Sequence, residues 1–223
     1  MAVTFRSKTS TQRTATGNET VTEPAGATSG DALIALVVAD AATTIGIPAG
    51  WHSLYTGTTG SADFSVSWIE RGGSAPSLTW TFTGTNIYRE VQILCLQGSA
   101  AITLDSQSAS GGTGTSDHNP DPPSTTAVAS TSLAVAGAVN FASFFSYTAS
   151  TGYTIRTDTT SNLYDGVMET KSLSASGAEN PSAIADGNNG DWWEGCTVTF
   201  TDVSASGQVP YQPQYLNAPV MAQ

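Results

Sequence analysis

Charge is what this sequence has least of. Of its 223 residues only 11% are charged, and lysine and arginine together number seven. No basic stripe is formed, because the seven cations are spread along the chain as Arg6, Lys8, Arg13, Arg71, Arg89, Arg156 and Lys171. Clustered cations are needed to neutralise phosphates, and the net charge is −11. The composition therefore predicts no nucleic-acid partner and disfavours an anionic membrane surface.

Cysteines and long apolar runs are also scarce. Cys95 and Cys196 each share the apolar side of an alternating segment, so we interpret them as reduced, buried thiols, with a disulfide as the alternative. The longest apolar run, residues 32–39, is eight residues long. It is too short to cross a membrane and suits a buried strand. The first residues lack the apolar core of a signal peptide, so we expect synthesis in the cytoplasm without an export signal.

The motifs of common catalytic sites are missing. His52 and His118 are the two histidines, and we expect both to face solvent or cap a turn. The sequence contains no G-x-S-x-G elbow, no H-E-x-x-H or C-x-x-C pair and no glycine-rich phosphate loop. No pair of acidic residues suggests the two carboxylates of a glycoside hydrolase. We therefore predict that the protein is not an enzyme and has no cofactor.

What is present is a pattern of short alternating segments. Apolar residues alternate with Ser and Thr in 64–68 and again in 78–82, which is the period of a strand with one wet face. No segment has a sustained helical period. Similar runs recur about every ten residues and predict an antiparallel, jelly-roll-like β-sandwich. The predicted strands are 2–6, 18–23, 31–40, 51–57, 63–71, 77–82, 87–97, 101–106, 131–140, 142–149, 152–158, 165–172 and 195–203.

The chain also repeats itself weakly. Residues 32–40 resemble 133–141, a separation of 133 − 32 = 101, and Gly50-Trp51 resembles Gly152-Tyr153 at 102. Residues 69–71 resemble 168–170 at 99, and the two cysteines are 101 apart. Because these separations nearly agree, we predict two related halves within one sandwich, with the cysteines on equivalent strands.

The polar segments set the predicted domain limits. We expect a sandwich domain over 1–203, with residues 107–130 forming a crossover loop between its halves. Residues 204–223 contain three prolines and show no alternation, so they cannot continue a sheet. We predict an extended arm that lies on a partner. Its candidate contact residues are Tyr211, Tyr215, Leu216 and Val220, and Trp192 is a further candidate.

One acidic segment is weighed as a metal site. Asp186 and Asp191 enclose a Gly-Asn-Asn-Gly run and offer oxygen ligands for calcium, but the register of a calcium loop is missing. A plain turn is the favoured interpretation, because Asp-Gly and Asn-Gly are strong turn signals. The neighbouring pair Trp192-Trp193 must point to opposite faces if extended, which leaves sugar stacking as an alternative role for one of them. Trp68 and Trp80 are expected in the core.

Two short motifs carry a resemblance to a known class of proteins. They are Gly30-Asp31-Ala-Leu-Ile-Ala and Ile47-Pro-Ala-Gly-Trp51, followed by Glu70-Arg71 and a late Gly-Asp-Trp-Trp segment. Over about residues 1–203 the chain resembles small phage-encoded virion structural proteins. The resemblance implies a jelly-roll-like sandwich in a head decoration or cement protein, or in a tail-associated domain, without catalytic residues. Asp31 is expected to accept hydrogen bonds from turn amides.

These observations together predict a non-enzymatic bacteriophage virion protein. A capsid decoration or cement protein that stabilises the head is favoured, with the major capsid protein or another virion protein as partner. We expect a homo-oligomer, with a trimer favoured. The alternative is a tail-associated module that binds a receptor or a glycan.

Overall fold

The computed structural model describes residues 2–14, 16–40, 43–58, 62–84, 88–112, 120–140, 146–159, 164–184 and 193–202, with backbone alone for 109–112. All regular structure in these residues is β-strand. No helix among them is long and apolar enough to cross a membrane. The chain is an antiparallel, all-β protein with two large sheets, as the alternating pattern predicts.

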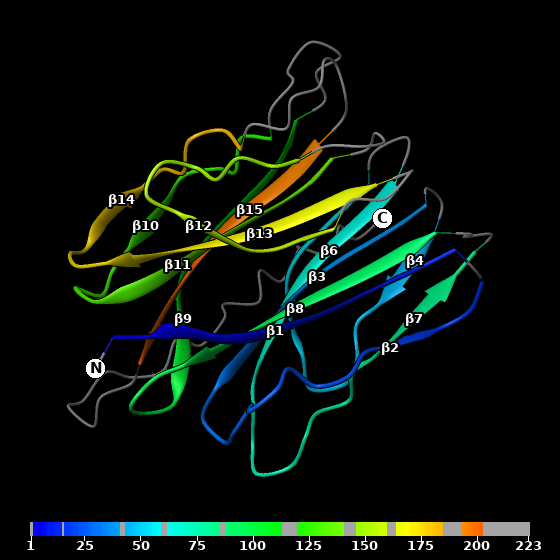
Figure 1. The fold of residues 1–223 in the computed structure, drawn as a ribbon, viewed down its shortest axis with the longest axis horizontal. Helices are drawn as coiled ribbons and strands as arrows, with labels where there is room; N and C mark the ends of the chain where they lie inside the picture. Colours follow the sequence, from blue (N-terminus) through cyan, green and yellow to red (C-terminus); the bar gives the residue numbers. More distant parts are fainter. Residues whose placement is uncertain are drawn as a thin grey trace, which may run out of the picture.

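Each large sheet is built from one half of the chain (Figure 1). Sheet I contains, in spatial order, β1 (Thr4–Arg13), β8 (Arg89–Gln97), β3 (Ala32–Asp40), β6 (Ala62–Glu70) and β5 (His52–Thr58). Sheet II contains β9 (Ile102–Gly112), β15 (Trp193–Asp202), β11 (Ser132–Asn140), β13 (Asp165–Leu173) and β12 (Thr154–Thr159). The two orders match strand for strand, so the predicted repeat of two halves is confirmed. In a jelly roll the chain passes back and forth between the two sheets, so that part of the prediction is not confirmed.

The main core lies between the two sheets. Alternate residues of β3, from Ala32 to Val38, face alternate residues of β11, β13 and β15, including Val135, Met168 and Phe200. All of these side chains are essentially inaccessible to water. Burying an aliphatic side chain stabilises a fold by about 1.5–3 kcal/mol, so this layer supplies most of the hydrophobic free energy.

Smaller sheets cover the outer faces. The outer side of sheet I packs under β2 (Glu19–Thr20), β7 (Thr79–Thr83) and β4 (Thr44–Gly46), from which Trp80 and Phe82 point inward. On the other half, β10 (Thr125–Ala127) pairs with β14 (Gly177–Glu179), and Tyr147, Tyr153 and Ile184 lie on the outer side of sheet II. The central strands β3 and β11 are consequently buried on both faces, which explains why they read as nearly continuous apolar runs.

A buried ion pair and two glycine turns hold the segments that pack on the outer faces of the sheets. Arg89 and Glu19 form a salt bridge of 3.0 Å in which each side chain is 1% exposed. Gly50 has a φ of 88° in the turn that leads to Trp51, and the Trp51 amide donates to the Pro48 carbonyl. Gly152, in the second half, has a φ of 81° before Tyr153. Only glycine adopts this conformation without strain, so both halves keep it at the same place.

Most predicted strands are present, with three kinds of difference. The segment predicted at 142–149 lies partly outside the described residues, and 146–149 contain only a single-residue bridge. The short strands β4, β10 and β14 were not predicted, because three residues are too few for an alternation to show. The predicted loop over 107–130 is shorter than expected, since residues 107–112 continue β9 and 125–127 form β10. Ser and Gly in 108–112 hide that strand from a hydrophobic pattern.

Candidate functional site

The edges of the two sheets meet along two seams. At one, β1 of sheet I contacts β12 of sheet II; at the other, β5 contacts β9. We call them the β1/β12 seam and the β5/β9 seam. Each of the four edge strands contains a β-bulge, at Arg6, Leu54, Asp105 and Arg156. Bulges at edges interrupt the row of free backbone groups and discourage strand addition, so the seams rather than the edges are the places to seek a site.

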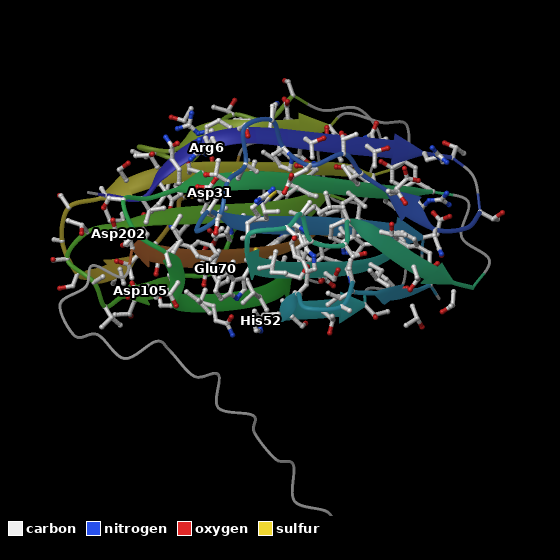
Figure 2. The ribbon with its side chains drawn as sticks, turned by 90° about the horizontal axis from the view of Figure 1, so that it is seen from below. Arg6, Asp31, His52, Glu70, Asp105 and Asp202 are labelled. Atoms are coloured by element: carbon white, nitrogen blue, oxygen red, sulfur yellow. The ribbon has the colours of Figure 1, made fainter. Side chains whose placement is uncertain are left out.

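Two bulge residues hold loops. Arg6 reaches Asp31 through its Nε at 2.9 Å, and Figure 2 shows the two side by side. Asp31 also accepts the Thr28 amide at 2.8 Å, as the sequence predicts. In the second half Asp105 accepts the amides of Val128 and Ala129. Both carboxylates fix the turn before a central strand and are structural.

The β1/β12 seam contains a buried carboxylate with a full set of donors. Glu90 of β8 is inaccessible to water. One of its oxygens accepts from Gln12 at 3.1 Å and from the Tyr88 hydroxyl at 3.0 Å. The other accepts from Gln92 and Thr159. Burial raises the pKa of Glu90, while these four donors oppose the rise. Such a saturated network is typical of a polar group that specifies packing.

The equivalent position in the β5/β9 seam is Glu194. Glu90 pairs with Val38 across β8 and β3, and Glu194 pairs with Val139 across β15 and β11. Val38 and Val139 are the matching inward residues of their strands, 139 − 38 = 101 apart. Glu194 is 2% exposed and also points between the sheets. The two halves therefore place a glutamate at the same point of the sandwich.

The donors around Glu90 are not repeated around Glu194. Gln92 pairs with Leu36, and Cys196 pairs with Gly137, which matches Leu36 in the second half. Cys196 therefore occupies the position of Gln92. Gln12, the partner of Glu90 on β1, is replaced by Gly111, the partner of Glu194 on β9.

Thr159 is replaced in the same way. In sheet II, Thr159 pairs with Gly166, which in turn pairs with Val139. In sheet I, Gly57 pairs with Phe64, which in turn pairs with Val38. Because Val38 and Val139 match, Thr159 and Gly57 occupy equivalent positions. Around Glu194, a thiol and two glycines thus occupy the positions that carry two side-chain amides and a hydroxyl around Glu90.

One donor remains at Glu194. The Tyr55 hydroxyl hydrogen-bonds its carboxyl, but Oε2 is buried and has no hydrogen-bond partner in the described part of the chain. Oε2 occupies the space that a Cβ on Gly57 would fill. Burial raises the pKa of Glu194 to about 7, and the negative charge of Asp63 adds to the rise. This carboxyl therefore changes its charge near neutral pH.

Two hollows lie at this end of the sandwich, and Glu194 lines neither of them, although its neighbours Tyr55, Gly57 and Asp63 do. The first, of about 240 Å³, opens between the sheets at the β5/β9 seam and is lined by Leu54, Tyr55, Gln107, Ser108, Cys196 and Val198. The second, of about 430 Å³, is lined mainly by threonines, as Thr43, Thr44, Ile45, Thr56, Gly57, Thr58 and Asp63. Asp63 accepts the Thr43 amide at 2.6 Å, while the buried Thr43 hydroxyl has no partner in the described part.

The other seam is closed at the matching bulge. Arg156 lies over the Phe5 ring at 4.6 Å and donates to the Thr170 hydroxyl at 2.8 Å. Its counterpart in the β5/β9 seam is the bulge residue Leu54, which lines the first hollow. The site that the structure presents is therefore the β5/β9 seam around Glu194 and Tyr55.

The residues proposed from sequence are outside the part of the chain that the structure describes. Asp186, Asp191, Trp192, Tyr211, Tyr215, Leu216, Val220 and His118 are all outside the described residues, so those predictions stay open. No group of three or more His, Cys, Asp or Glu side chains in the described ranges is placed to hold a metal ion. His52 is exposed beside Trp68, as predicted (Figure 2).

The four tryptophans among the described residues pack in or against the core, and the stacking role weighed for Trp192 stays open. Trp80 is inaccessible to water and packs edge-on against Trp51, whose indole donates to the Ser77 carbonyl. Trp193 is 6% exposed, so it is not the stacking residue of its pair. Trp68 is partly buried against Phe200, in agreement with its predicted core position.

Both cysteines are free and buried, which confirms the thiol interpretation. They lie on the equivalent strands β8 and β15, as predicted, but not at equivalent positions. Cys95 belongs to the outer core under Trp80, and Cys196 to the core between the sheets. Register places Glu90 opposite Glu194, a separation of 194 − 90 = 104, so the 101-residue spacing of the cysteines does not mark equivalent sites.

Sequence reasoning missed Glu194. Its only signal was a glutamate two residues before an apolar cysteine on a strand, the same arrangement as Glu90 before Gln92. Comparing the sequence with itself at a separation of 104 residues, rather than 101, aligns Glu90 with Glu194.

The architecture defines a class of protein: a duplicated antiparallel β-sandwich in which each half of the chain forms one sheet. No protein-family model, curated protein or solved structure matches this chain.

Proposed function

We propose that this chain is a non-enzymatic structural protein of a bacteriophage particle, and in particular a head decoration or cement protein. The observation that carries the proposal is the closure of the sandwich. Both sheets are covered on their outer faces, all four edge strands are bulged, and Val128 is the one exposed large apolar side chain among the described residues. A closed, hydroxyl-rich domain of this kind suits display in many copies without self-aggregation.

Attachment is assigned to residues 204–223, on sequence grounds. This segment lies outside the described residues and contains Tyr211, Tyr215, Leu216 and Val220 together with three prolines. Deletion of 204–223 is expected to leave the melting temperature nearly unchanged and to weaken oligomerisation and attachment to the particle. Unfolding of the truncated chain would assign the segment to the domain instead.

The test of the function is location. Heads and tails of the purified particle are separated and the chain is sought in each by mass spectrometry. Presence on heads, together with greater heat resistance of heads that carry it, supports decoration. Absence from the particle overturns the proposal.

A second candidate is a tail-associated glycan-binding module. It is favoured by the hollow that opens between the sheets at the β5/β9 seam beside Tyr55, Gln107 and Ser108. Presence on tails alone would select this candidate.

A further inference from the structure

The β5/β9 seam contains a buried carboxyl with no cation beside it. Glu194 of β15 is 2% exposed, with β9 and β11 as its neighbours in sheet II and β5 and β6 facing it from sheet I. None of β3, β5, β6, β9, β11 and β15 contains a lysine or an arginine. An ionised carboxylate that is removed from water needs a cation or several donors to offset its lost hydration. In the described residues Glu194 has the Tyr55 hydroxyl as its one side-chain donor.

The titratable groups around Glu194 supply no positive charge. Asp63 of β6 is buried, and its negative charge opposes a second negative charge on Glu194. Cys196 of β15 is a neutral thiol, because burial raises its pKa to about 12. Tyr55 of β5 is neutral too, since burial and the carboxyl of Glu194 both raise the pKa of its phenol. Asp40, at this end of β3, already accepts a backbone amide. Ionisation of Glu194 therefore places an uncompensated charge between the sheets.

The strand that lies over this carboxyl has no fully buried residue. Two residues of β5 touch Glu194: Tyr55 through its hydroxyl and Gly57 through its backbone. Among the described strands β5 pairs only with β6, and its ladder is interrupted by the bulge at Leu54. All seven of its residues are exposed or half-buried. Segments with few buried contacts open locally at a lower free energy than the rest of a fold. The edge strand β5 is therefore the element that can move to admit water to Glu194.

We propose that β5 (residues 52–58) is a pH-dependent flap, which lies on Glu194 while that carboxyl is protonated and separates from β9 and β15 when it ionises. Opening hydrates the carboxylate and exposes the thiol of Cys196, which lines the hollow between β5 and β15. The β1/β12 seam stays closed over the same pH range, because four side-chain donors hold Glu90 there. The inference concerns the isolated chain and does not rest on the proposed place in a phage particle.

The direction of the effect follows from proton linkage. With the seam closed, burial raises the pKa of Glu194 to about 7, whereas the ordinary value in water is 4.5. The open form consequently binds fewer protons, and its population rises with pH between these two values by at most about tenfold per pH unit. Partial exposure of the closed site reduces this slope. We expect the open population to grow about tenfold or more from about pH 5 to about pH 8.

Hydrogen–deuterium exchange of the full chain tests the proposal. Protection of β5 is compared with protection of β12, the matching edge strand of sheet II, after correction for the intrinsic pH dependence of amide exchange. Protection of β5 should fall about tenfold or more relative to β12 over this pH range. Low concentrations of urea should leave that fall unchanged, because a local opening exposes little surface. Alkylation of Cys196, followed by mass spectrometry, should accelerate in parallel.

Four variants separate ionisation of Glu194 from other causes. Glu194→Gln keeps the size of the side chain and should make the protection of β5 independent of pH. Tyr55→Phe removes a donor that favours the ionised form, so the loss of protection should move to higher pH. Asp63→Asn removes the charge that opposes ionisation and should move the loss to lower pH. Glu169→Gln is the matched control: it removes a buried carboxyl of raised pKa from β13 and should leave the profile of β5 unchanged.

Three results would overturn the proposal. The first is a protection of β5 that does not vary with pH relative to β12. The second is a pH-dependent loss that persists in Glu194→Gln. The third is a loss shared by every strand and steepened by urea, which would show that the whole domain unfolds instead. If Glu194→Gln does not fold, the opposite shifts expected of Tyr55→Phe and Asp63→Asn decide the question, and unshifted profiles overturn it. The location of the chain in a particle affects none of these results.

Discussion

The two seams of this sandwich share the same backbone arrangement but differ in how fully their buried glutamate is hydrogen-bonded. At the β1/β12 seam Glu90 is saturated by four donors, and Arg156 closes the edge over Phe5. At the β5/β9 seam the Tyr55 hydroxyl is the one side-chain donor to Glu194 among the described residues, and Leu54 lines an open hollow. Register equates the two glutamates, so the difference lies in the side chains around them and not in the fold.

The comparison teaches what a buried carboxyl is for in each place. A fully satisfied polar network rigidifies a core and fixes its packing. A buried acceptor without a partner costs stability and persists most readily where something else uses it. Glu90 in the first half is thus part of a satisfied network, whereas Glu194 in the second half has one buried carboxyl oxygen without a hydrogen-bond partner in the described residues.

The largest expected effect separates the two glutamates directly. Glu90→Ala leaves four donors without their acceptor, of which Tyr88 and Gln92 are buried, and should lower the free energy of unfolding by about 3 kcal/mol. Glu194→Ala leaves only the Tyr55 hydroxyl and should cost about 1 kcal/mol or less. Urea unfolding of both variants measures the difference. Equal losses would show that the seams are energetically alike.

A pH titration sharpens the same comparison. Burial raises the pKa of Glu194 to about 7, and burial also raises the pKa of Glu90 and Glu169. A carboxyl whose pKa is raised in the fold contributes stability fully below its unfolded pKa of 4.5, and this contribution is lost as pH rises through about 7. The free energy of unfolding should therefore fall between pH 5 and pH 8.

The share that Glu194 contributes is isolated by Glu194→Gln. It should remove about 1–2 kcal/mol of this fall, less than full burial would give because solvent screens part of the charge. Glu90 and Glu169 keep the remainder. Identical pH profiles of the variant and the parent would contradict the assigned pKa.

Adding one hydrogen-bond donor beside Glu194 should make the β5/β9 seam more like the β1/β12 seam. Cys196→Gln places the Gln92 side chain of the first half beside Glu194. One new hydrogen bond to a buried acceptor should raise the free energy of unfolding by about 1 kcal/mol, which corresponds to about 2–4 °C in melting temperature. Scanning calorimetry measures it, with Cys196→Ala as the control that adds no donor. A loss of stability in the glutamine variant alone would show that the hollow cannot accept the amide.

The smallest effect concerns the bulges. Arg156→Leu copies Leu54 into the β1/β12 seam and removes the contact with Phe5 and the hydrogen bond to Thr170. A partly exposed cation–π contact is worth about 0.5–1 kcal/mol, so the loss should be of that size. The reverse variant, Leu54→Arg, removes a partly buried side chain that packs on the main core and should cost about 1 kcal/mol. Chemical denaturation of the pair measures both, and a large loss from Arg156→Leu would make that residue part of the core.

The sequence by itself determined the β class, the position of most strands, the duplication and the buried state of both cysteines. These features are local, because strand alternation has a period of two and a repeat shows as a constant separation. It also showed Asp31 as the acceptor of a turn, since such bonds span only a few residues.

Only the tertiary structure decided which residues meet between the sheets. A shift of one residue in register moves a side chain to the opposite face, so the 101-residue spacing of the cysteines placed one inside the sandwich and the other outside it. The glutamates align at 104 instead, because the matched strands are offset by three more residues. The side-chain donors of Glu90 come from β1, β12 and the start of β8, whereas in the described residues of the other seam only Tyr55 of β5 hydrogen-bonds Glu194. No local pattern carries that information, since each site joins strands far apart along the chain.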